Sequence, residues 1–255
     1  MSFEEIKTCY LNSHYSNYLI LITGITITKV IISSYLISIL FHKWQSKEEK
    51  HVVDIPFLLG VFFYLFIIGK LIDLIMALIY INPEISSNID LINLARFRYI
   101  FAVVTVLPLY ILGLYLYLYK QNLDKSYQEI RKIIKNNTIA FLSIYFGFWI
   151  IILNFLNNLY YIRLVIIAIC FIFLVISWIF YRAHRGNILS DINCLVISIG
   201  FFIYALSQIS LPFIALVLNC FILDAEVISV MIMEILSLIS FIIILIGFKT
   251  RVSYR

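Results

Sequence analysis

The chain has 255 residues, of which 63% are hydrophobic and only 13% are charged, with a net charge of +5. Its mean hydropathy is +1.03. Soluble domains carry about 25% charged residues, so this composition excludes a water-soluble globular domain and predicts an integral membrane protein whose main partner is the lipid bilayer.

Seven apolar segments follow one another along the chain. Each is long enough to cross about 30 Å of hydrocarbon as an α-helix. They are unbroken runs rich in Ile, Leu, Phe and Tyr, whereas a transmembrane β-strand would show about ten residues of alternating polarity. We therefore predict an all-α fold, a bundle of seven transmembrane helices in one domain over residues 1–255. The predicted helices cover approximately residues 18–41, 55–80, 97–119, 139–157, 161–181, 194–218 and 227–248.

Basic residues are concentrated on one side of this predicted bundle, in the first, third and fifth connections and the C-terminal tail. The opposite side carries only Lys7, Arg96, Arg98 and Arg163. Because Lys and Arg mark the cytoplasmic side, we expect a multi-pass protein of the cell membrane with its N-terminus outside and its C-terminus inside. Topology and anionic headgroups explain the basic residues, so no nucleic-acid partner is expected.

Ionisable residues inside the predicted helices are the best clue to function, because each costs about 2.5 to 3.5 kcal/mol on insertion scales. Lys29 lies in the first helix, Lys70 and Asp73 in the second, and Glu234 in the seventh. Their depths from the outer face are similar, and Lys70 and Asp73, three residues apart, share a face. If these three helices are neighbours, the four groups meet and neutralise one another.

Two interpretations of this quartet remain open. It is either a static neutral clamp that fixes helix register, or the lining of an outward-facing cavity in which a ligand, ion or proton exchanges with one partner. Gln208 in the sixth helix adds a polar group to the same half of the bundle. A proton relay is a narrower version of the second interpretation, because burial can shift the pKa of a carboxyl or lysine by up to about 3 to 5 units.

Two prolines occupy corresponding places in the third and sixth predicted helices, Pro108 and Pro212. We expect helix kinks there. A bundle helix tolerates proline when a neighbouring hydroxyl satisfies the carbonyl that proline leaves free. Thr105 and Ser207 are the candidates for that role.

The longest inside connection, residues 120–137, carries apolar residues at three- and four-residue spacing among its basic ones. This pattern suits a short helix in the headgroup region, and it would be the docking surface for a cytoplasmic signalling partner. The alternative is a solvated extension of the third or fourth helix.

Metal, cofactor and catalytic chemistry are not expected. Cys9, Cys170, Cys194 and Cys220 match no metal-ligand spacing. Cys9 and Cys220 fall on or near the outer side, so they either form a disulfide or stay as free thiols. The histidines lie outside the predicted helices or at their inner edge, which leaves no haem ligand inside the bundle, and no HExxH motif occurs.

Two family resemblances bear on function. The seven-helix topology is similar to that of microbial rhodopsins, but where they carry the retinal lysine this chain has Glu234 and Ser237, with Lys249 only at the inner end. Retinal bound through that lysine is not expected. Arg96 to Tyr119, with Leu107-Pro108-Leu109 in its middle and an aromatic end, resembles the third helix of the seven-transmembrane sensory region of prokaryotic histidine kinases.

The second resemblance covers about a tenth of the chain. It implies a sensor, and because no kinase follows residue 255, its output would pass to a separate protein. We therefore predict a sensor or receptor-like membrane protein that is not an enzyme and whose ligand is unknown. A small secondary transporter or proton-coupled carrier and a structural subunit of a membrane complex are the alternatives.

Overall fold

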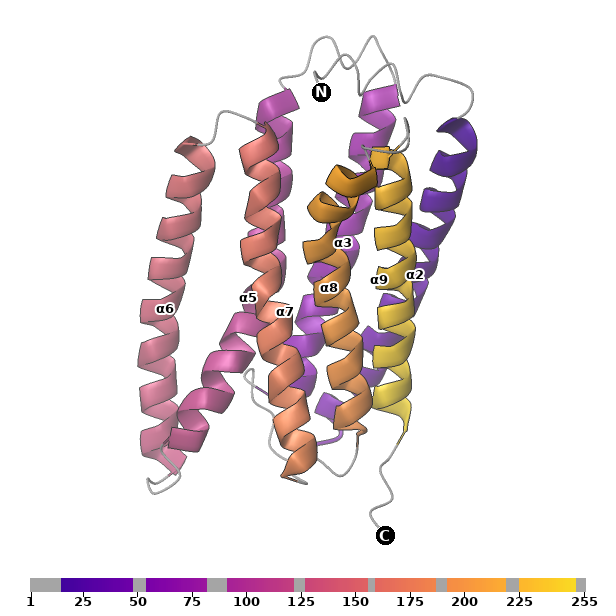
Figure 1. Ribbon diagram of the computed structural model, residues 1–255. Helices are drawn as coiled ribbons and strands as arrows, with labels where there is room; N and C mark the ends of the chain where they lie inside the picture. Colours follow the sequence, from indigo (N-terminus) through magenta and orange to yellow (C-terminus); the bar gives the residue numbers. More distant parts are fainter. Residues whose placement is uncertain are drawn as a thin grey trace.

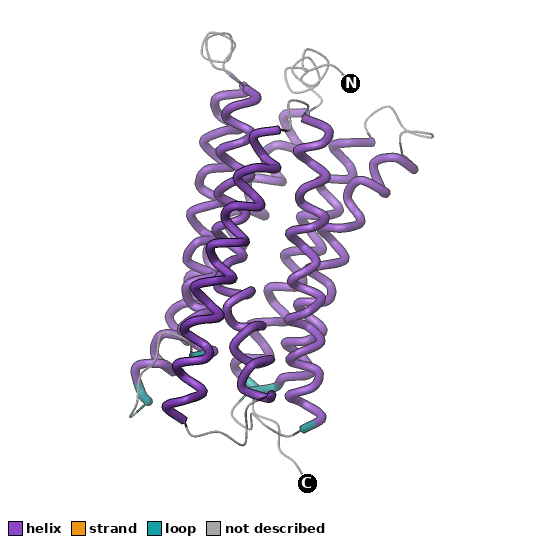
Figure 2. Tube along the Cα trace, turned by 90° about the vertical axis from the view of Figure 1, so that its left-hand side faces the viewer, coloured by secondary structure: helices purple, strands orange, loops and turns teal. Residues whose placement is uncertain are grey.

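The computed structural model describes residues 15–47, 54–81, 91–121, 127–155, 159–186, 192–218 and 225–250. These residues form long α-helices and contain no strand, so the prediction of an all-α fold is confirmed. The helix axes run roughly parallel to one another in both views (Figures 1 and 2). In chain order the helices are α2 (Tyr15–Gln45), α3 (Ile55–Ile81), α5 (Leu91–Gln121), α6 (Tyr127–Phe155), α7 (Leu159–Arg185), α8 (Cys194–Leu218) and α9 (Ala225–Lys249).

Four of these helices are long and apolar enough to cross a membrane, counted over the residues that the structure describes. A shorter apolar stretch, Cys194–Ile209, lies in α8. Large hydrophobic side chains such as Ile31, Ile144 and Phe171 point away from the bundle and are more than 60% exposed, as expected where lipid replaces water. The chain is therefore a membrane protein with transmembrane helices. The four candidate spans are Leu21–Gln45, Ile55–Met76, Arg96–Tyr115 and Ile228–Lys249.

Contacts among six of the helices form a closed cycle in the order α2, α3, α5, α7, α8, α9 and back to α2. The first, second and last helices are thus neighbours, with α2 between the other two. Helix α6 packs on α5 and stands apart from the cycle at the left of Figure 1. Helices α2, α5, α7 and α9 begin at the end drawn at the top of Figure 1, which we call the upper end, and α3, α6 and α8 begin at the lower end.

Two glycines explain why α8 and α9 lie so close together. A Cβ on Gly200 would come 3.1 Å from the Ser240 carbonyl oxygen on α9, and a Cβ on Gly247 would come 2.9 Å from the Ile197 backbone nitrogen on α8. The backbone N–H of Asn193 also donates to the Gly247 carbonyl at 2.9 Å. Small residues that let two backbones approach are the usual basis of helix association in lipid.

Aromatic side chains fill the middle and lower part of the cycle. The Phe241 ring on α9 lies 4.8 Å from Phe66 and 5.7 Å from Phe63 on α3, and 5.3 Å from Tyr204 on α8. Leu36, Leu40 and Ile244 are fully buried around them. This packing makes the lower half of the interior mostly apolar, with Ser177 and Ser198 as buried polar exceptions between α7 and α8.

Helix α6 differs from the predicted span, because it begins at Tyr127 rather than near residue 139. Residues 127–137 therefore belong to α6. The separate headgroup helix predicted within 120–137 is wrong for this part, and the alternative, an extension of the fourth predicted helix, is the one that the structure shows. The chain carries no glycine or proline there to stop the helix. Residues 122–126 lie outside the described part.

Both prolines lie within helices, Pro108 in α5 and Pro212 in α8. The lower half of α5 leans away from α7 towards the lower end of α6 (Figure 1). The hydroxyls take a different role from the one predicted, because Thr105 donates to Phe101 O at 2.9 Å and Ser207 to Tyr204 O at 2.7 Å. A proline instead leaves free the carbonyl four residues before it, which belongs to residue 104 for Pro108 and to residue 208 for Pro212.

Candidate functional site: an intramembrane charge network

Five charged side chains from four helices form one continuous set of ion pairs, which we call the charge network. Its members are Lys29 on α2, Lys70 and Asp73 on α3, Arg98 on α5 and Glu234 on α9. Lys29 pairs with Glu234 Oε2, and Lys70 Nζ lies 3.1 Å from Glu234 Oε1. The structure therefore brings together all four residues of the predicted quartet.

Arg98 is the member that sequence reasoning missed. It binds Asp73 in a bidentate manner, with Nε on Oδ1 and Nη2 2.9 Å from Oδ2. Because Arg98 lies at the start of the predicted third helix, it was counted among the residues that set topology. The available signal was its place inside the predicted helix, in the first turn, together with a carboxylate, Asp73, at a similar depth in the neighbouring helix.

Exposure decreases steadily along the network. The side chains of Asp73 and Arg98 are 31% and 26% exposed, Lys70 is 15%, Glu234 is 7% and Lys29 is 1%. Asp73 and Arg98 are also the members nearest the upper end of the bundle, because Arg98 lies in the second turn of α5. The network is thus accessible at one extremity and closed at the other.

Hydroxyl groups on α9 continue the polar path beyond Lys29. Lys29 Nζ donates to Ser237 Oγ at 2.9 Å, Ser237 donates to Glu234 O at 2.8 Å, and Ser240 donates to Ser237 O at 2.6 Å. Ser33, one turn below Lys29 on α2, is fully buried, and its Oγ has no hydrogen-bond partner among the described residues. The path then meets the mostly apolar lower half of the bundle.

The charges of the network do not cancel. Three cations, Lys29, Lys70 and Arg98, face two carboxylates, Asp73 and Glu234. Lys29 with Glu234 and Arg98 with Asp73 form two complete pairs, and Lys70 lies between them, 3.1 Å from Glu234 Oε1 and 3.5 Å from Asp73 Oδ2. Lys70 is therefore the surplus charge of the network and, among the ion pairs of the described residues, the one that joins the α2–α9 pair to the α3–α5 pair.

The other residues predicted for the site lie outside the network. Gln208 on α8 is half-buried and donates to Ser207 Oγ at 3.4 Å, with no ion pair or hydrogen bond to the network. Tyr204 is the α8 side chain that interacts electrostatically with Asp73 and Arg98. Cys170 and Cys194 are free and buried, whereas Cys9 and Cys220 fall outside the described residues.

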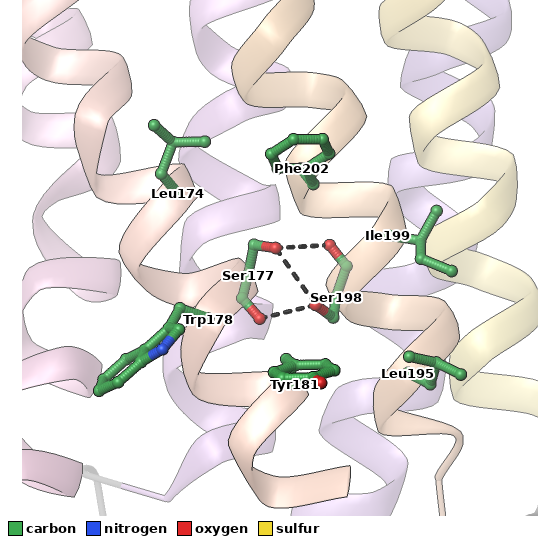
Figure 3. Close-up of a pocket in the computed structure, with 8 residues that line it drawn as sticks. All are labelled: Leu174, Ser177, Trp178, Tyr181, Leu195, Ser198, Ile199 and Phe202. Carbon is green, nitrogen blue, oxygen red and sulfur yellow. Dashed lines mark hydrogen bonds between the residues drawn. The ribbon is translucent and has the colours of Figure 1, made fainter. Parts of the chain in front are cut away.

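A separate groove of about 450 Å³ lies between α7 and α8. Figure 3 shows Ser177 and Ser198 facing each other in it, where each hydroxyl donates to the other's carbonyl, at 2.8 and 2.7 Å. The two serine hydroxyls already have hydrogen-bond partners in each other's carbonyls, and the groove opens towards the outside of the bundle. The groove is a weaker candidate than the charge network. Its other lining residues are Leu174, Trp178, Tyr181, Leu195, Ile199 and Phe202.

Comparison with known proteins identifies no matching family model, no similar curated protein and no similar solved structure.

Proposed function

We propose that this protein is a sensor or receptor-like protein of the cell membrane, in which the charge network is the switch. Its helices would form seven spans with the N-terminus outside, so the upper end of the bundle is the outer end. A signal arriving there changes which charges pair, and the helices that carry those charges shift. The output passes to a separate partner at the inner end.

The observation that carries this proposal is the position of Lys70 between two otherwise complete ion pairs. A static clamp needs equal numbers of opposite charges, and an additional buried cation makes it less stable rather than more. An arrangement with two alternative partners for one cation is what a two-state element requires. The graded exposure supports access from one side, as a sensor of the outer medium needs.

The packing of α9 supports transmission to the inner end. Lys43 Nζ near the end of α2 donates to Phe248 O at 3.3 Å, so α2 and α9 are connected below the network as well as within it. The glycine contacts fix α9 against α8. A displacement of Glu234 would therefore move α2, α8 and α9 together relative to α3 and α5, and the basic segment 120–137 at the inner end is the proposed partner surface.

The experiment that tests the sensor is a distance measurement between spin labels placed below the network. Labels at Tyr64→Cys on α3 and Ile246→Cys on α9, both exposed positions, are introduced into a background without native cysteines and reconstituted in lipid nanodiscs. Glu234→Gln breaks two ion pairs of the network, and Glu129→Gln on the exposed surface of α6 is its control.

A sensor predicts that Glu234→Gln changes the Tyr64–Ile246 distance on the order of 1–2 Å, the usual size of a helix shift, while Glu129→Gln leaves it unchanged. If Glu234→Gln lowers the unfolding temperature but leaves the distance unchanged, the network is a clamp in a structural subunit. If the purified protein carries protons or solute across liposomes, a carrier replaces the sensor.

A further inference from the structure

The network carries one more cation than carboxylates. This excess positive charge can be neutralised by a bound anion or by the loss of a proton. A bound anion requires space for it beside Lys70 or Arg98. A proton requires no cavity. The side chains around Lys70 are packed, with the Phe66 ring centroid 5.8 Å from Nζ and the same ring 4.8 Å from Phe241.

The groups that face Lys70 decide which one exchanges the proton. They are Asp73 on its own helix, Lys29 on α2, Arg98 on α5 and Glu234 on α9, whereas Tyr204 on α8 interacts with Asp73 and Arg98 and not with Lys70. Both carboxylates are already paired with a cation, so protonating either would raise the excess from one charge to two. Arginine keeps its proton at all accessible pH values. The exchange is therefore confined to the two lysines.

Access distinguishes the two lysines. Lys29 is 1% exposed, pairs with Glu234 and donates to Ser237, so a proton that it loses must first pass to another buried group. Lys70 is 15% exposed and lies 3.5 Å from Asp73 Oδ2, and Asp73 is 31% exposed. A proton leaving Lys70 thus reaches the upper end through one carboxylate.

We infer that the proton is the ligand of this switch and that Lys70 is the group that exchanges it with the medium at the upper end, an inference that rests on the proposed function. One N–H bond of the Lys70 ammonium breaks, its electron pair stays on Nζ, and the proton passes through Asp73 Oδ2 to water. The network is then neutral, with Lys29–Glu234 and Arg98–Asp73 as two separate pairs. The ionic link between α3 and α9 is lost.

The test is a distance measurement at the level of the network, on the full-length protein in nanodiscs. Spin labels at Leu71→Cys on α3 and Ile235→Cys on α9, both exposed, report the separation of the two helices at about pH 5 and about pH 9, a range in which buried lysines are known to titrate. Three proteins are compared: one with Lys70, one with Lys70→Met, which never carries the charge, and one with Lys70→Arg, which always does. Lys47→Met, at an exposed lysine paired with Asp54, is the control.

The expected result is a distance that changes with pH on the order of 1–2 Å with Lys70 present and in the Lys47→Met control. Lys70→Met should hold the high-pH distance, and Lys70→Arg the low-pH distance, at both pH values. If Lys70→Arg does not fold, Lys70→Met alone decides. A distance that is constant with Lys70 present, or a pH response that survives Lys70→Met, overturns the inference.

The two proposals fail separately. If pH leaves the Leu71–Ile235 distance unchanged while Glu234→Gln still moves the labels below the network, the sensor stands and its ligand is not the proton. If pH moves the upper labels but Glu234→Gln leaves the lower distance unchanged, Lys70 exchanges its proton without transmitting a signal, and the sensor is rejected.

Discussion

At the scale of single residues, the position of Lys70 changes what a charge swap between Lys29 and Glu234 should do. Breaking a buried pair by removing one partner costs about 3 to 5 kcal/mol. Two groups that pair only with each other would recover this loss when both are exchanged. Glu234, however, also holds Lys70 at 3.1 Å, so a lysine at position 234 would face Lys70 as a like charge.

We therefore expect Lys29→Glu and Glu234→Lys each to lower the free energy of unfolding by about 3 to 5 kcal/mol, and the double swap to recover only part of it. The same double swap in a Lys70→Met background should recover most of it, because the repulsion is gone. Thermal or denaturant unfolding in detergent measures this. Full recovery with Lys70 in place would mean that Lys70 carries no charge in that state.

The serine pair between α7 and α8 allows a second residue-scale prediction. Ser177 and Ser198 each donate to the other's backbone carbonyl, so removing one hydroxyl leaves the other bond in place. We expect Ser177→Ala and Ser198→Ala each to lower the free energy of unfolding by about 0.6 kcal/mol, the average for such bonds between membrane helices, and the double variant to lose nearly the sum. A large coupling energy in the double-mutant cycle would instead show that the contact between the two hydroxyls, at 3.2 Å, dominates.

At the scale of the element, the contact of α8 with α9 depends on the absence of two side chains. Gly200→Ala would place a Cβ 2.5 Å from Ile244 Cγ1, close to the backbone of the same residue. We expect a loss of about 1 to 3 kcal/mol from overpacking, measured as the free energy of unfolding.

Gly24 is the matched control, because a Cβ there meets nothing within 4 Å. Gly24→Ala should be neutral or stabilising by up to about 1 kcal/mol, since alanine is the better helix former. If the two substitutions have the same effect, the closeness of α8 and α9 contributes nothing to stability.

The helices were the most predictable part of this chain, and their contacts were the least. Apolar runs predicted 194–218 to the residue but began α6 near residue 139 instead of Tyr127, because a hydropathy pattern marks where apolar side chains lie and not where hydrogen bonding along the backbone begins. The quartet was predicted from depth alone. Arg98 was not, because partner choice depends on side-chain direction, which only the packing of α3 against α5 determines.

At the scale of the whole molecule, the closed cycle of helices separates two ends with different chemistry. Charged groups gather near the upper end, and aromatic side chains fill the interior below them. If the upper end is the outer one, as the distribution of Lys and Arg predicts, the network is reached from outside the cell. The opposite orientation would make the same network a sensor of the cytoplasm, so orientation decides what is sensed.

Single cysteines at Asn93 and Lys47, in a background without native cysteines, measure this orientation. Both side chains are exposed, Asn93 near the upper end and Lys47 beyond α2 at the lower end. A thiol reagent that cannot cross the membrane should label Asn93→Cys in intact cells, and Lys47→Cys only after the cells are permeabilised. The reverse pattern would place the upper end inside, and the accessible carboxylate Asp73 would then exchange protons with the cytoplasm, where pH varies much less than outside.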